Sequence, residues 1–195
     1  VPASAAAADA IPGDFAARVA PCFEQVNAVV FGFRMRRLAA LGLVAVDRPA
    51  RAFSVSCVTP LGVKLFDVVA TNGAAAARFV NPALAARDGD LAQAVADDLA
   101  RAYFDWAPPP GTPGAFRRGR MVFAADDARG TTEYRFAWAD GRLAEKVRRE
   151  GGRRRWSIAY RGYGVTPGGL VPTAMCIDNH QYGYRLVVNT REAGL

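Results

Sequence analysis

The feature that most constrains the fold is a long succession of short segments in which apolar and polar residues alternate. In residues 51–59, for example, Phe53, Val55 and Cys57 alternate with serines, which is the pattern of a strand buried on one face. Parallel strands need long crossover connections, usually helices, and these segments have none between them. The sequence therefore predicts a mainly β, α+β fold with eleven antiparallel strands in one curved sheet. The expected strands are residues 24–36, 38–46, 51–59, 63–70, 75–80, 119–125, 131–138, 142–149, 153–160, 172–178 and 182–191.

One clear helix interrupts the strands at residues 90–106, where Asp90 can cap the first turn. Asp97 and Asp98 fall outside its apolar stripe. We expect this helix to cover the concave face of the sheet with that stripe. The stripe, at spacings of three and four residues, is Leu91, Val95, Leu99, Tyr103 and Trp106.

The chain is expected to form a single domain, because 195 residues lie within the usual range for one hydrophobic core. Residues 1–10 are rich in alanine and are expected to be a flexible spacer, and residues 11–195 the folded domain. A short helix is predicted over residues 11–22, because Pro12 suits a first turn and Phe15 falls on its apolar face.

The segment SCVTPLGVKLFDVV, residues 56–69, predicts a tight hairpin. Pro60 suits the first central position of a turn, and Gly62 can adopt the positive φ that a bulge requires. The second strand is apolar on both faces, so the sequence leaves open whether Leu65 or Phe66 points to the concave side.

The chain is basic, with 25 Lys and Arg against 18 Asp and Glu and a net charge of +7. Such a surface attracts anionic membranes, nucleic acids or acidic partners without choosing among them. No apolar run is long enough to span a bilayer. Cys22, Cys57 and Cys176 lie in no metal-binding or redox array, which leaves one disulfide with a spare thiol, or three buried thiols.

The sequence contains few residues that could catalyse a chemical step. His180 is the single histidine, so a histidine metal site or a paired relay is excluded, and no nucleotide-binding or hydrolase motif is present. The acidic pair at residues 126–127 is interpreted as a solvated turn. An enzyme would have to use Asp67 with Lys64, or Glu133, which are the polar groups on apolar strands. We therefore expect no enzymatic activity, no cofactor and no metal.

The segment KVRREGGRRRW, residues 146–156, has five arginines around a Gly-Gly turn and raises the question of nucleic acid binding. On a hairpin its charges alternate with Val147 and Trp156 and largely face water, and no nucleic-acid-binding motif accompanies them. Contact with anionic lipid headgroups is a simpler use for these arginines. No nucleic acid partner is expected.

With this order of elements, the chain resembles the LolA/LolB family of bacterial lipoprotein carriers and outer-membrane lipoprotein receptors. The resemblance lies in the hairpin VSCVTPLGVKLFDV, in the helix at residues 90–106 after the fifth strand, and in the closing segment QYGYRLVV. It covers nearly the whole chain from about Phe15. It implies an eleven-stranded half-barrel whose concave apolar face, covered by helices, binds acyl chains of a lipoprotein or lipid without catalysis.

The resemblance also suggests site residues. The receptor contacts the membrane through an exposed leucine, for which Leu170 is the candidate, and the carrier holds its lid with a buried arginine that matches no single position here. The candidate lining residues of the cavity are Phe31, Phe33, Phe53, Val55, Leu65, Phe136 and Trp138 from the strands, and Leu99 and Tyr103 from the helix.

The implied location is the periplasm of a Gram-negative bacterium, free or as an outer-membrane-anchored lipoprotein. Residues 1–10 resemble the spacer that follows a removed signal peptide or a lipid-anchored cysteine. The expected partners are acyl chains and an anionic membrane surface, and a monomer is favoured. The alternative is a periplasmic scaffold or interaction lipoprotein without lipid cargo, which would have a fully packed interior.

Overall fold

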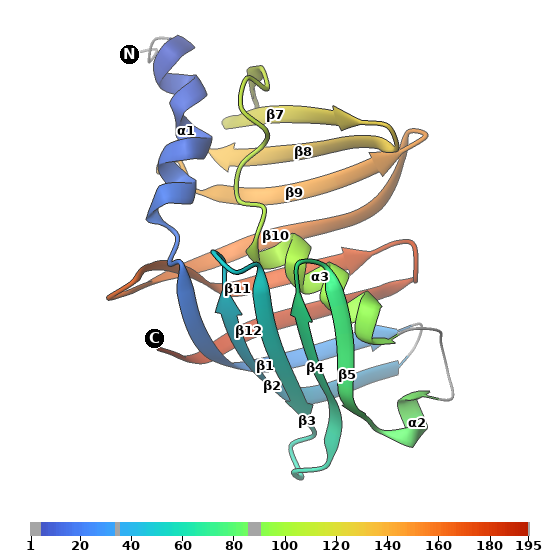
Figure 1. Cartoon of the computed structure of the whole chain (residues 1–195). Helices are drawn as coiled ribbons and strands as arrows, with labels where there is room; N and C mark the ends of the chain where they lie inside the picture. Colours follow the sequence, from blue (N-terminus) through green and yellow to red (C-terminus); the bar gives the residue numbers. More distant parts are fainter. Residues whose placement is uncertain (1–4, 34–35, 86–90, 195) are drawn as a thin grey trace.

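The computed structural model describes residues 5–33, 36–85 and 91–194 (Figure 1). One antiparallel twelve-stranded sheet curves into an open half-barrel, in the order β5-β4-β3-β2-β1-β12-β11-β10-β9-β8-β7-β6. The strands are β1 (Cys22–Phe33), β2 (Arg36–Asp47), β3 (Ala52–Val58), β4 (Lys64–Thr71), β5 (Ala74–Val80), β6 (Gly114–Arg117), β7 (Arg120–Asp127), β8 (Gly130–Ala137), β9 (Leu143–Glu150), β10 (Arg153–Thr166), β11 (Gly169–Asn179) and β12 (Tyr184–Gly194).

Helices lie on the concave side, as the sequence predicts. Helix α3 (Leu91–Tyr103) crosses the middle of the half-barrel, and α1 (Ala5–Arg18) lies over the end that contains β7, β8 and β9 (Figure 1). The ring of Phe15 on α1 packs edge-on against the ring of Phe136 on β8, with centroids 5.9 Å apart. The four-residue helix α2 (Pro82–Ala85) follows β5.

The expected count of eleven strands is wrong, because β6 forms between the helix predicted at residues 90–106 and the strand predicted at residues 119–125. Gly114 is needed there for close packing: a Cβ atom would lie 2.6 Å from the ring of Phe123 on β7. Strand β10 also runs to Thr166 instead of residue 160, since Gly162 and Gly164 allow β11 to approach. A Cβ atom at either glycine would lie 2.9 Å from Thr173.

The N-terminal expectations need a similar correction. Helix α1 begins at Ala5, so residues 5–10 of the expected spacer belong to a helix, while residues 1–4 lie outside the described part of the chain. The helix ends at Arg18, and Cys22 begins β1 as an exposed thiol. Cys57 and Cys176 are buried, and all three thiols are unpaired, so neither cysteine alternative holds in full.

The hairpin of residues 56–69 contains a bulge that explains its apolar second strand. Cys57 is opposite Phe66, but Val58 is opposite Lys64, so Leu65 is the extra residue. Leu65 packs with Ala40 and Cys57, and Phe66 packs against the same group and against the main core. Both side chains therefore contribute to the interior.

The first and last strands of the chain, β1 and β12, pair with each other in the middle of the sheet. β1 runs antiparallel to β12, with Phe33 opposite Tyr184 and Glu24 opposite Gly194. The β1–β2 hairpin and the β11–β12 hairpin consequently lie side by side at one rim of the half-barrel.

Candidate functional site

Helix α3 is attached to the sheet through a buried carboxyl group. Asp98 is 3% exposed and accepts hydrogen bonds from the hydroxyl of Tyr184, the side-chain amide of Asn179 at 3.3 Å and the guanidinium of Arg101 at 3.0 Å. Burial raises the pKa of the Asp98 carboxyl, and these three donors oppose the rise. The sequence places Asp98 outside the apolar stripe. It is buried because α3 packs against strands on more than one side, β4 and β5 as well as β11 and β12.

A second buried charge holds the other end of α3. Lys146 on β9 is 1% exposed, and its ammonium group donates hydrogen bonds to the backbone carbonyls of Arg101 and Asp105 at the C-terminal end of the helix. Burial lowers the pKa of Lys146 to about 7. Rings of Trp106, Tyr134 and Tyr160 surround the amine with centroids 5.9, 5.9 and 6.0 Å away. No sequence signal marks this lysine, since it belongs to the segment interpreted as solvated.

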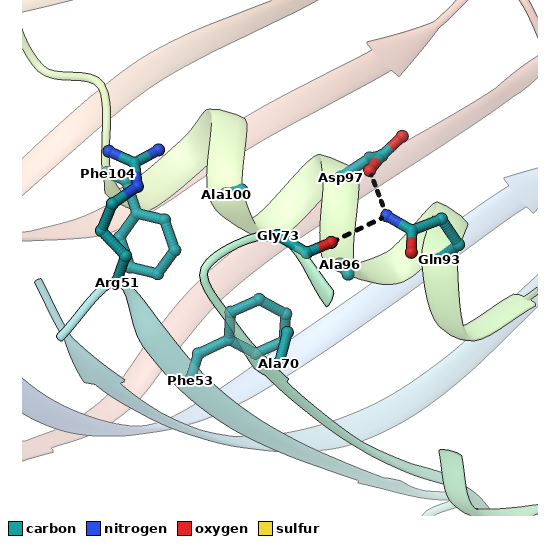
Figure 2. A pocket seen from close by; sticks show the side chains of 9 residues that line it. All are labelled: Arg51, Phe53, Ala70, Gly73, Gln93, Ala96, Asp97, Ala100 and Phe104. Carbon is teal, nitrogen blue, oxygen red and sulfur yellow. Dashed lines mark hydrogen bonds between the residues drawn. The ribbon is translucent and has the colours of Figure 1, made fainter. Parts of the chain in front are cut away.

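The space between α3 and the sheet is small. A cavity of about 50 Å³ lies between α3 and strands β3 and β4 (Figure 2). Because a water molecule takes about 30 Å³ of liquid volume, this cavity holds one or two waters and no acyl chain. Its lining includes Phe53, Ala70, Ala96, Ala100 and Phe104.

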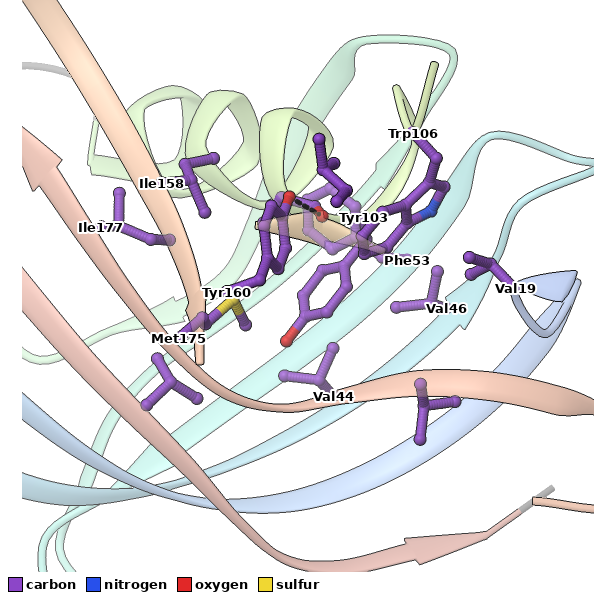
Figure 3. Packing of buried hydrophobic residues seen from close by; sticks show 14 of the residues in the cluster. Val19, Val44, Val46, Phe53, Tyr103, Trp106, Ile158, Tyr160, Met175 and Ile177 are labelled. Carbon is purple, nitrogen blue, oxygen red and sulfur yellow. Dashed lines mark hydrogen bonds between the residues drawn. The ribbon is translucent and has the colours of Figure 1, made fainter. Parts of the chain in front are cut away.

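The remainder of the interior is packed with apolar side chains. Figure 3 shows Tyr103 at the end of α3 and Trp106 from the segment that follows it, against residues of the sheet, among them Tyr160 and Met175. Tyr160 donates a hydrogen bond from its hydroxyl to the carbonyl of Ala102, at 2.8 Å.

Towards the rim, the concave face continues as an aromatic shelf, which consists of Phe31, Phe33, Tyr182 and Tyr184. Phe31 lies 5.3 Å from Tyr184 and 6.5 Å from Phe33, and Tyr182 stacks on Tyr184 at 6.4 Å, all between ring centroids. Phe31 and Phe33 are only half-buried. Since the hydroxyl of Tyr184 also bonds Asp98, the shelf meets α3 at its anchor.

Three solved structures share this architecture over almost their full length. A candidate outer membrane lipoprotein-sorting protein domain from Vibrio parahaemolyticus has a TM-score of 0.63 at 13% identity, covering 97% of this chain and 92% of that one. A LolA superfamily protein from Nitrosomonas europaea has a TM-score of 0.55 at 11% identity, covering 100% and 94%. The chain has a LolA/LolB-like fold. A DUF1329 family protein from Desulfovibrio piger has a TM-score of 0.56 at 7% identity, covering 97% and 92%. Neither a family model nor a curated protein matches the sequence.

Four of the predicted lining residues belong to the main core with α3 in this LolA/LolB-like half-barrel. Phe53 and Val55 are buried there, and Phe53 borders the small cavity, whereas Leu65 is buried in a separate cluster with Ala40 and Cys57. On the helix, Tyr103 is buried and Leu99 is half-buried against the main core. Phe31 and Phe33 belong to the shelf at the rim.

The structure does not bring Phe136 and Trp138 to the same place. Phe136 is fully buried beneath α1, where it also packs against Phe123 at 5.7 Å between centroids. Trp138 is 38% exposed and contacts Phe116, near the β6 edge of the sheet.

Leu170, the expected membrane contact, lies in the core of the LolA/LolB-like fold. It is 8% exposed, and its carbonyl accepts a hydrogen bond of 2.9 Å from the backbone of Ala20. The expectation is therefore wrong for this residue. Leu61, 92% exposed at the tip of the β3–β4 hairpin, is an apolar residue that points to solvent. The Pro60 and Gly62 turn signals could have identified this tip from the sequence.

The polar groups weighed for catalysis are dispersed. Asp67 pairs with Lys64 at 2.8 Å on β4, whereas Glu133 pairs with Arg135 on β8, far away in the strand order. Asp127 pairs with Arg148 at 2.7 Å, which lowers the pKa of that carboxyl.

The described ranges contain neither a metal-binding cluster nor a membrane-spanning helix. No cluster of three or more His, Cys, Asp or Glu side chains suited to a metal ion occurs within residues 5–33, 36–85 and 91–194. In the same residues, no helix has the length and apolar character needed to cross a membrane.

Proposed function

We propose that the protein binds an acyl group of a lipoprotein or lipid on the concave face of the half-barrel, without a chemical step. The observation that carries this proposal is the aromatic shelf, where apolar rings stay half-exposed next to a helix that polar groups hold in place. Each methylene that such a surface removes from water contributes about 0.8 kcal/mol.

Helix α3 is the lid in this proposal. The cavity beneath α3 is too small for an acyl chain, so a chain can enter there only if α3 moves away from the sheet. Much of the buried face of α3 consists of alanines, Ala92, Ala96 and Ala102, whose burial contributes less than that of large side chains. Water can replace the hydrogen-bond partners of Asp98 and Lys146 when the helix opens.

The setting that we propose is the periplasm or outer membrane of a Gram-negative bacterium, in lipoprotein or lipid trafficking. The LolA/LolB-like fold supports it, together with the net charge of +7 and exposed Leu61, which suit an anionic membrane surface. A second candidate is a periplasmic interaction protein without lipid cargo, which the packed interior favours.

Titration with a fluorescent fatty acid, combined with native mass spectrometry of protein purified without detergent, tests the proposal. Saturable binding of one probe per chain, or a co-purified acyl species, is the expected result. A protein that is empty and also rejects the probe would leave the interaction protein as the function.

A further inference from the structure

Two cross-strand rows of residues meet at the rim where the β1–β2 and β11–β12 hairpins lie side by side. One row, which contains Phe33 and Tyr184 of the aromatic shelf, runs Arg36, Phe33, Tyr184 and Asn179 across β2, β1, β12 and β11. The adjacent row runs Arg37, Gly32, Arg185 and Asp178 across the same strands. Because side chains of adjacent rows point to opposite faces of a sheet, Arg36 lies on the face of the shelf, and Arg37 and Arg185 lie on the other face.

An open groove of about 640 Å³ lies at this rim. Its charged lining consists of three arginines, Arg36, Arg37 and Arg185, against one carboxylate, Asp178, with His180 beside them. Asp178 is already engaged, because it binds Arg185 through both oxygens, at 2.5 and 3.0 Å. Within the described residues, no carboxylate forms an ion pair with Arg36 or Arg37. The groove therefore keeps an excess of positive charge.

Gly32 leaves a gap in the middle of the arginine row. It is opposite Arg37 on β2 and opposite Arg185 on β12, and it has no side chain to fill the space between them. A Cβ atom added there would meet only the carbonyl oxygen of Arg185, at an ordinary contact distance of 3.7 Å. A compact anion can therefore approach the backbone between two guanidinium groups.

We propose that this groove binds the phosphate group of an anionic amphiphile whose acyl chain lies along the aromatic shelf. The proposal rests on the proposed function and adds the headgroup class to it. Guanidinium groups form forked, charge-assisted hydrogen bonds with phosphate, and Arg37 and Arg185 flank Gly32 on one face. The shelf lies on the other face, but Tyr184 also lines the groove, so a molecule bound at the rim can contact both.

The test compares ligands with one acyl chain and different heads. Oleoyl lysophosphatidic acid and monooleoylglycerol, each below its micelle concentration, are titrated into the protein by calorimetry. We expect the phosphate ligand to bind at least about tenfold more tightly, the ratio that one charge-assisted hydrogen bond provides. Glycerol 3-phosphate serves as the head alone, and we expect it to bind far more weakly than the full amphiphile.

Matched variants distinguish phosphate binding in the groove from attraction to positive charge elsewhere on the protein. Arg36→Gln with Arg37→Gln should abolish the preference for the phosphate head while monooleoylglycerol still binds. Arg153→Gln with Arg154→Gln removes the same charge from an exposed pair at the start of β10, outside the groove, and should retain the preference. Gly32→Val, which fills the gap and suits a strand, should reduce the preference without removing any charge.

The outcomes are distinct. Equal affinity for the two oleoyl ligands, or equal loss in both double variants, would overturn the headgroup site and leave the acyl-binding function intact. Glycerol 3-phosphate binding as tightly as the amphiphile would replace the lipid with a free phosphate compound. Failure of both oleoyl ligands to bind would overturn the proposed function itself.

Discussion

The ammonium nitrogen of Lys146 lies 2.8 Å from the carbonyl oxygen of Asp105, just beyond the last turn of α3. A buried amine on β9 thus supplies a donor to carbonyls that a helix leaves without intrahelical partners at its C-terminal end. Two acceptors, on Arg101 and Asp105, meet this amine, and a neutral amine can still donate to both.

The stability of the protein should therefore depend on pH through Lys146. Its pKa falls from 10.5 to about 7 on folding. Between these values the unfolded chain binds a proton that the native chain lacks, so the free energy of unfolding rises with pH by up to about 1.4 kcal/mol per unit. Below about pH 7 both states are protonated and this contribution is constant. Urea unfolding of wild type and Lys146→Met at about pH 6 and about pH 9 measures it. An unchanged difference between the two proteins would contradict the lowered pKa.

Asp98→Ala should loosen α3 without unfolding the sheet. The variant removes the acceptor of three hydrogen bonds and leaves the partly buried hydroxyl of Tyr184 without the carboxylate that it donates to, so local opening of α3 should become easier by about 1 to 3 kcal/mol. Hydrogen exchange of α3 amides measures this change, with amides of β11 as the reference. The neighbour Asp97, with a 43% exposed side chain, provides the control Asp97→Ala. If α3 is the lid, Asp98→Ala should also bind the acyl probe more tightly, because the open form is more populated.

Leu61→Ser should weaken binding to vesicles that contain anionic lipid and leave the unfolding midpoint unchanged. Leu61 is 92% exposed at the β3–β4 tip, so the substitution removes apolar contact with the bilayer and no packing. Val165→Ser is the control, since Val165 is 82% exposed on a different hairpin. Equal effects in a vesicle sedimentation assay would argue against a specific role for the β3–β4 tip.

Phe15→Ala should destabilise the protein by about 3 to 5 kcal/mol, the usual cost of removing a fully buried aromatic side chain. Phe15 joins α1 to the sheet through edge-on contacts with Trp106, Phe136 and Tyr163. Phe116→Ala, at an exposed ring near the sheet edge, should change stability by no more than about 0.5 kcal/mol. Thermal and urea unfolding compare the two. If both variants changed the stability by similarly small amounts, α1 would be only loosely attached to the sheet.

The alternation of apolar and polar residues predicts eleven of the twelve strands and their antiparallel order, because that pattern is local. β6 is missed because a short strand between prolines and glycines has too few residues to establish a period. The close contacts between strands at Gly114, Gly162 and Gly164 are visible only in the folded sheet.

The candidate site is harder to predict from the sequence than the strands are. Phe53 and Tyr103 could be placed near the helix, since both follow a simple period. Asp98 and Lys146 could not, because their burial depends on how strands distant in sequence surround α3. The arginine groove has the same origin: Arg37 and Arg185 lie on either side of Gly32 only because β1 pairs with β12.

The pairing of β1 with β12 also has a consequence for how the chain folds. The strands on either side of this pair are joined mainly by hairpins, whereas β1 and β12 come from opposite ends of the sequence. Such long-range pairing is slow, because the entropy of closing a large loop must be overcome before any contact forms. Until β12 docks, β1 has an unpaired edge and the concave face is divided between two incomplete sheets. The step that completes folding is therefore the same step that assembles the aromatic shelf and the arginine rows.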